Sequence, residues 1–80
     1  MFTANMEHIK KMISDEKMFR KEKLGEAKEL MDYLSDNINY LGEEEIGEIS
    51  TSLKTLITMV SASNFKINGL KQEIKEMESK

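Results

Sequence analysis

Apolar residues in the second half of the chain recur at alternating spacings of three and four positions. The most regular stretch carries Ile46, Ile49, Leu53, Leu56 and Val60. This spacing places all five on one stripe of an α-helix, at the a and d positions of a heptad repeat, and predicts a core or oligomer seam. Five further positions continue the register, and one of them is polar: Ser63, Ile67, Leu70, Ile74 and Met77.

The first half of the chain follows the same pattern with an interruption. Apolar residues keep helical spacing over 6–13 and again over 24–41. Continuing the register across 14–23 places three charged residues where apolar ones belong: Glu16, Arg20 and Lys23. Two interpretations stay open, namely one long helix with a charged middle, or a short helix 5–13 followed by a second helix from about residue 15.

A turn near Gly42 separates the two halves. Asn37, Asn39 and Gly42 are expected to mark the end of the first helix, and Gly42 suits the C′ position because glycine can adopt positive φ. The three glutamates of 43–45 follow it, and carboxylates in a first turn favour the positive end of the helix macrodipole. Since short connections join antiparallel neighbours, we predict two main antiparallel helices over roughly 15–40 and 43–62.

Folding the chain back at Gly42 brings the two irregular stretches to one level. Residues 61–69 are weak in helix-forming residues and then lie opposite 15–23. Either both helices break at this level, or one long hairpin carries a layer of polar residues there. We call this layer, formed by 15–23 and 61–69, the waist. We favour the long hairpin.

The predicted fold class is therefore all-α, an antiparallel helical hairpin with coiled-coil-like heptads in a single domain of residues 1–80. Outer segments 5–13 and 65–78 flank a central hairpin, 15–62. One hairpin buries only one face of each helix, so we expect hairpins to assemble into a helical bundle.

Composition narrows the class of protein. The 80 residues include no Cys and no Pro, which excludes disulfides and thiolate metal sites and favours long helices in a reducing compartment. A chain this short buries a small core, so self-association or a partner protein is the expected source of further burial.

No apolar run reaches membrane-spanning length, so we expect a cytoplasmic protein without a membrane partner. Eleven lysines beside one arginine suggest a low-GC bacterium or its phage.

Charge is uneven along the chain. Residues 1–28 carry seven basic and five acidic side chains, residues 29–50 carry seven acidic and no basic ones, and residues 51–80 carry five basic and three acidic ones. The formal net charge is −3. Long-range attraction to nucleic acid is therefore not favoured.

Residues with catalytic or metal-binding chemistry are sparse. His8 is the one histidine, and we expect it at the surface. Asp32 and Asp36 share a helix face, but without a Glu-x-x-His motif such a pair is more typical of a solvated face than of a metal site. The four glycines are scattered and form no phosphate loop. We therefore predict no catalytic residue, no metal site and no cofactor.

Basic side chains near the waist are the best electrostatic candidate for a site. The predicted interaction or ligand site comprises six residues: Lys17, Phe19, Arg20, Lys23, Ser61 and Asn64. Cations beside polar side chains suit a phosphate or an acidic partner. The alternative is a solvated stretch whose acidic neighbours balance the lysines.

Residues 41–57 resemble the second helix of the small helical-hairpin phosphatases of sporulation, whose motif reads Ser-Gln-Glu-Leu-Asp. Ser50 and Leu53 match that motif, whereas its Gln and Glu are replaced and Lys54 stands where the functional aspartate belongs. The resemblance covers 17 of 80 residues. It implies a helical hairpin, assigns no family, and argues against phosphatase activity.

These features lead us to expect a small non-enzymatic bacterial or phage regulator that binds another protein through a helical face. We also expect a homo-oligomer, most simply a dimer of hairpins. The alternative is an oligomeric binder that holds a phosphorylated or nucleotide ligand at the basic polar waist. An enzyme is least expected, because the sequence offers no nucleophile–base pair.

Overall fold

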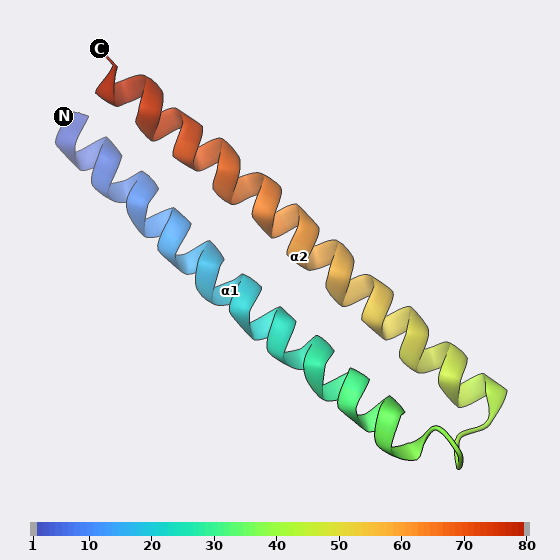
Figure 1. Ribbon diagram of the computed structural model, residues 1–80. Coiled ribbons are helices and arrows are strands. Elements are labelled where there is room, and N and C mark those ends of the chain that lie inside the picture. Colours follow the sequence, from blue (N-terminus) through green and yellow to red (C-terminus); the bar gives the residue numbers. More distant parts are fainter. Residues whose placement is uncertain (1, 80) are drawn as a thin grey trace.

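The computed structural model describes residues 2–79, which form two long α-helices joined by a short turn (Figure 1). Helix α1 covers Phe2–Asn37 and helix α2 covers Glu43–Glu78. The helices run antiparallel, side by side, in a rod of 59 × 14 × 13 Å. No strand occurs among the described residues. The predicted all-α fold, an antiparallel helical hairpin, is confirmed.

Both helices are continuous through the stretches where a break was an open alternative. Helix α1 stays helical across 14–23 and helix α2 across 61–69, so the molecule is the long hairpin. The outer segments and the central hairpin correspond to no interruption of either helix. The charged residues of α1 keep the regular spacing, lie at seam positions and are partly buried, because long side chains cover apolar surface with their stems. They are Glu16, Arg20 and Lys23.

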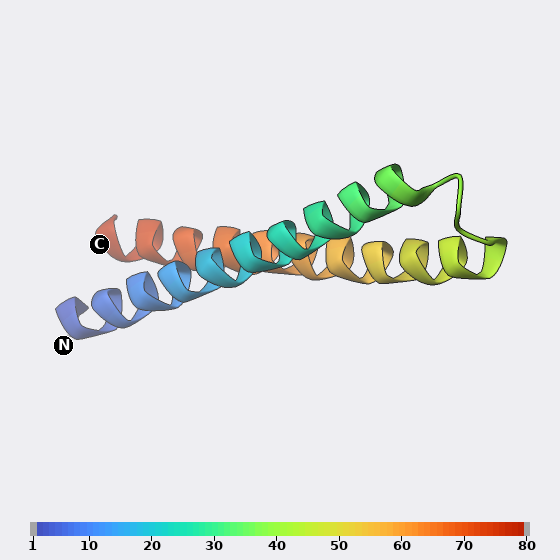
Figure 2. The same ribbon diagram turned by 90° about the horizontal axis from the view of Figure 1, so that it is seen from below.

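The seam between the helices follows the predicted register along the whole of α2. Its inward positions from Ile46 to Met77 are all buried or half-buried. In the stretch predicted as the core or oligomer seam, Leu53 is buried and four residues are half-buried: Ile46, Ile49, Leu56 and Val60. The helices cross when the rod is seen from below (Figure 2), as expected for helices that pack through such a seam.

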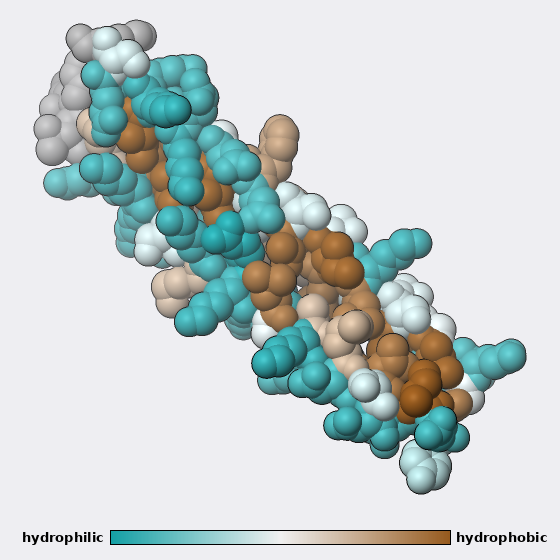
Figure 3. Space-filling view, viewed as in Figure 1, coloured by the Kyte–Doolittle hydropathy of each residue, from teal (hydrophilic) through white to brown (hydrophobic). Residues whose placement is uncertain are grey.

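The closed part of the core lies at the end of the rod that holds both termini. There four buried residues pack together: Ile9, Ile13, Ile67 and Leu70. Met12, Ile74 and Met77 cover them. We call residues 2–20 and 61–78 the terminal half and residues 21–60 the turn half. In the turn half Leu53 alone is buried among the described residues, and apolar surface gathers over this half on the face drawn in Figure 3.

The turn differs from the expected one in its conformation. Helix α1 ends at Asn37, and the backbone N–H groups of Tyr40 and Leu41 donate to the Asn37 carbonyl at 2.8 and 3.1 Å. The residues between Asn37 and Gly42 reverse the direction of the chain, so Gly42 does not have to adopt a positive φ. It is the N-cap of α2 with φ −79° and ψ 166°, and its carbonyl accepts from the N–H of Ile46 at 3.0 Å. Asn37, one of the predicted end positions, ends α1, whereas the prediction of Gly42 as its C′ residue was wrong.

Candidate functional site

The predicted waist is a layer of polar contacts that ties the two helices together. Arg20 Nη1 donates to Asn64 Oδ1 at 2.5 Å across the seam. Ser63 is only 2% exposed, and its Oγ donates to the backbone carbonyl of Glu16 at 3.2 Å. The antiparallel register therefore brings 16–20 against 63–64, as folding the chain back at Gly42 predicts.

The other two charged residues at seam positions of the waist form ion pairs. Glu16 Oε2 lies 3.4 Å from Lys66 Nζ, which links the helices a third time. Lys23 Nζ lies 3.2 Å from Glu26 Oε2 and 5.4 Å from the centre of the Phe19 ring. No buried side-chain nitrogen or oxygen of the described residues lacks a hydrogen-bond partner.

The six residues of the predicted site consequently divide into three groups. Arg20 and Asn64 bond to each other, and Lys23 lies over Phe19 beside Glu26. Lys17 and Ser61 are exposed. Since Arg20 and Lys23 already have partners in the hairpin, the waist has the character of an interhelical joint. A phosphate bound at the waist would share Arg20 and Lys23 with these contacts.

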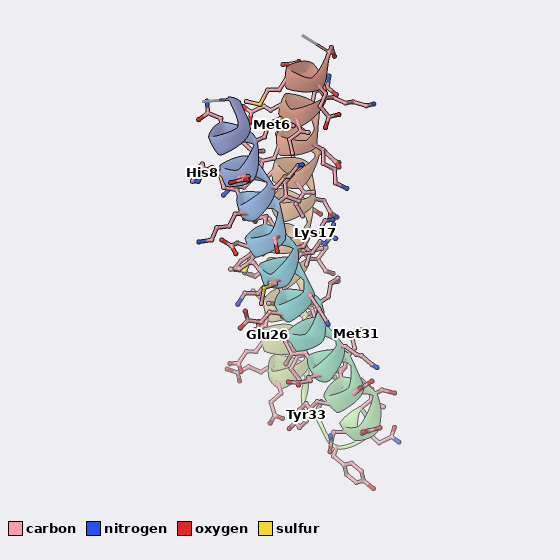
Figure 4. All side chains as sticks on the ribbon, turned by 90° about the vertical axis from the view of Figure 1, so that its left-hand side faces the viewer. Met6, His8, Lys17, Glu26, Met31 and Tyr33 are labelled. Atoms are coloured by element: carbon pink, nitrogen blue, oxygen red, sulfur yellow. The ribbon has the colours of Figure 1, made fainter. Side chains whose placement is uncertain are left out.

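A different surface emerges from the heptad positions that flank the seam. With a and d inward, position e lies beside a on one side of each helix, and position g lies beside d on the other side. In an antiparallel pair the two e positions share one side of the hairpin and the two g positions share the opposite side. Figure 4 shows Lys17 and Met31, both at e, on one side of α1, and Glu26 and Tyr33, both at g, on the other.

Large apolar side chains are exposed along the e side of the turn half. Leu24 and Met31 of α1 are 51% and 55% exposed, and Ile57 of α2 is 60% exposed. A shallow hollow on α2, lined by Ser50, Leu53 and Ile57 among others, adjoins them. We call Leu24, Met31 and Ile57 the apolar patch.

The apolar patch was absent from the predicted site, although the sequence carries its signal. That signal is an apolar residue at position e, next to an inward a position. The apolar stretches around Met31 and Ile57 are broader in the sequence than the seam of a single pair of helices requires. Apolar side chains at position e become buried when a third or fourth helix packs beside the pair.

Other chemistry is limited in the described part of the chain. His8 is exposed near the start of α1. No group of three or more His, Cys, Asp or Glu side chains in the described residues is arranged to hold a metal ion. Across residues 2–79, neither helix offers a stretch that is both apolar enough and long enough to cross a membrane.

Comparison with protein-family models, with curated proteins and with solved structures finds no match to this chain.

Proposed function

We propose that this protein is a non-enzymatic interaction module, a small bacterial or phage regulator that acts in the cytoplasm by binding another protein through a helical face. The apolar patch carries the proposal. It combines three large apolar side chains, each more than half exposed, on one side of a rod whose turn half has little closed core.

The patch offers apolar surface whose burial would contribute to the binding of a partner. Full burial of a Leu, Ile or Met side chain contributes roughly 1.5–3 kcal/mol, and about half of that is still unrealised at each of the three positions. Covering the patch therefore contributes about 3 kcal/mol before any contact from the half-buried seam is counted. A helix laid along the patch would also cover Leu53 and the hollow beside it.

Self-association is part of the same proposal. A second hairpin supplies two helices with matching apolar positions, and hairpins of this kind pair into helical bundles, of which a dimer is the simplest. The protein partner and the second copy draw on the same exposed side chains, so self-association would regulate access to the partner.

The test compares two substitutions that each place a carboxylate at an exposed apolar position. Ile57→Glu lies in the apolar patch, whereas Met18→Glu lies on the outer face of α1, where Met18 is 70% exposed. The wild-type hairpin is expected to self-associate in sedimentation velocity and to capture a specific protein from a low-GC bacterial lysate. Ile57→Glu is expected to weaken both by about tenfold or more, because it buries an unpaired charge.

The control Met18→Glu is expected to behave as wild type in both assays. Equal losses for Met18→Glu and Ile57→Glu would show that added charge, and not the patch, matters. A wild-type protein that stays monomeric at high concentration and captures the same proteins as Ile57→Glu would refute the proposal.

A further inference from the structure

Charge is sorted between the two long sides of the hairpin. We call the side at heptad positions e and b the lysine side, and the side at g and c the carboxylate side. On α1 the lysine side carries Lys10, Lys17, Lys21 and Lys28. On α2 it carries Lys54, Lys71 and Lys75. All seven are exposed, and none of them forms an ion pair with another described residue.

The carboxylate side has the opposite charge. On α1 it carries Asp15, Glu22, Glu26, Glu29 and Asp36. On α2 it carries Glu45, Glu48, Glu73 and Glu76. The one lysine on this side of the described chain, Lys66, is paired with Glu16 of the seam. Acidic residues on the lysine side occur only near helix ends: Glu7, Glu43 and Glu78.

Exposed apolar side chains accompany both sets of charges. The lysine side includes the apolar patch, Leu24, Met31 and Ile57. The carboxylate side includes Phe19, Tyr33 and Met59. Each side therefore has the composition that complements the other: apolar residues at the centre, and charges of opposite sign around them.

We propose that the surface that covers the lysine side of one hairpin is the carboxylate side of a second copy of this chain. Copies would stack side by side and parallel, with α1 next to α1 and α2 next to α2. This inference rests on the self-association proposed above and specifies its geometry and its driving charges.

Several positions along the rod match in this arrangement, although Leu24 faces Glu26 and Lys17 faces Phe19. Positions b and c are one residue apart, so their side chains lie within about 1.5 Å of the same level. Three such pairs carry opposite charges between neighbouring copies: Lys21 with Glu22, Lys28 with Glu29, and Lys75 with Glu76. Positions e and g are two residues apart, and they join Met31 to Tyr33, Ile57 to Met59 and Lys71 to Glu73. Glu43 and Glu45 are the like-charged exception.

A two-fold dimer through either side is disfavoured by the same charges. Two-fold symmetry would place lysines against lysines or carboxylates against carboxylates, and such juxtaposition is costly. Contact between unlike sides is heterologous, so it either continues into an open stack or closes into a ring. The dimer expected from the sequence then becomes the first step of a larger assembly.

The test uses two charge-reversed variants that leave every hydrogen bond and ion pair of the described hairpin in place. Lys21→Glu/Lys28→Glu reverses the lysine side, and Glu22→Lys/Glu29→Lys reverses the carboxylate side. Each variant alone places charges of like sign against each other at two levels of the stack, where residue 21 faces residue 22 and residue 28 faces residue 29. In sedimentation velocity at low salt, each is expected to self-associate about tenfold or more weakly than wild type. An equimolar mixture of the two is expected to assemble again, because each variant then meets charges of opposite sign at these two levels.

Single reversals on the outer faces provide the controls. Lys11→Glu and Asp32→Lys change the charge of α1 away from both sides and are expected to assemble as wild type does. Raising the salt concentration to about 1 M is expected to weaken wild-type assembly, because it screens exposed charges. Circular dichroism of every variant checks that the hairpin is folded.

The outcomes separate this inference from the proposed function. Side-by-side stacking is refuted if neither reversal weakens the assembly of wild type, or if the mixture of variants fails to reassemble. Neither result contradicts the proposed interaction module. A wild-type protein that is monomeric under all conditions overturns stacking and the proposed self-association, and the interaction module is then overturned as well if wild type captures the same proteins as Ile57→Glu. If monomeric wild type instead binds vesicles containing phosphatidylserine and Lys21→Glu/Lys28→Glu does not, the lysine side belongs to an anionic membrane and stacking is refuted.

Discussion

Ser63 is the position where a single side chain decides how the helices meet. It occupies a d position of an otherwise apolar seam on α2, and it is almost completely buried. Its hydroxyl reaches the backbone of α1 at Glu16, so the space between the helices at this level is filled by a small side chain. The Arg20–Asn64 and Glu16–Lys66 contacts lie next to it. At the waist the buried polar groups therefore have hydrogen-bond partners, and the space between the helices at Ser63 admits only a small side chain.

Replacing Ser63 with a larger apolar residue is expected to destabilise the hairpin, although the heptad pattern favours such a residue there. We expect Ser63→Leu to lower the free energy of unfolding by about 1–3 kcal/mol through overpacking. Ser61→Leu, at an exposed position two residues earlier, serves as the matched control and is expected to change it by less than about 0.5 kcal/mol. Urea unfolding followed by circular dichroism measures both. Equal stability of the two variants would contradict the role assigned to Ser63.

At the scale of the element, each helix is continuous despite residues that disfavour helix. Gly25 lies inside α1, and Gly47 and Gly69 lie inside α2, all at exposed positions. Each costs about 1 kcal/mol relative to alanine. No packing contact within the hairpin requires them, because a Cβ built at any of the three meets no atom within 4 Å. Helix continuity therefore depends on the long seam, where each turn adds packing that offsets weak local propensity.

Alanine at two of these glycines is expected to stabilise the isolated hairpin. Gly25→Ala and Gly69→Ala should each raise the free energy of unfolding by about 0.5–1 kcal/mol, and the double variant by about the sum, since the sites lie on different helices. Thermal and urea unfolding at low protein concentration provide the measurement. The reverse change at an exposed site of α2, Ala62→Gly, should lower stability by a similar amount. Destabilisation by either glycine replacement would show that the helix is packed differently there.

At the scale of the whole molecule, stability and exposed apolar surface lie at opposite ends of the rod. The terminal half contains the closed cluster of Ile9, Ile13, Ile67 and Leu70. The turn half contains a seam that is mostly half-buried and the apolar patch beside it. The terminal half therefore supports the hairpin, and the turn half offers surface to other chains.

The same substitution made in the two halves is expected to have different costs. Ile67 is 1% exposed, and we expect Ile67→Ala to lower the free energy of unfolding by about 2–5 kcal/mol. Ile49 is half-buried in the turn half, so Ile49→Ala removes less buried surface and should cost less. Denaturant unfolding of the monomer compares them. A larger loss for Ile49→Ala would place the main core in the turn half.

Much of the fold was predictable from the spacing of apolar residues alone. The 3–4 register over 46–77 implies one continuous inward stripe. The glutamates at 43–45 mark the start of α2 correctly. The level at which the two irregular stretches meet was also predictable, because antiparallel pairing about a short turn leaves little freedom. The candidate site was less predictable, since charged side chains at seam positions indicate a joint and a ligand site equally well.

Helical periodicity and a short turn are local properties, so the two helices, their antiparallel pairing and the polar waist could be predicted from the sequence. Only the tertiary structure shows that the helices are unbroken, that Arg20 donates a hydrogen bond to Asn64, and that Lys23 pairs with Glu26 over the Phe19 ring. Only it decided that the terminal half holds the closed core. The physical reason is that burial and the pairing of long side chains depend on how the two helices are placed against each other, which no stretch of sequence specifies alone.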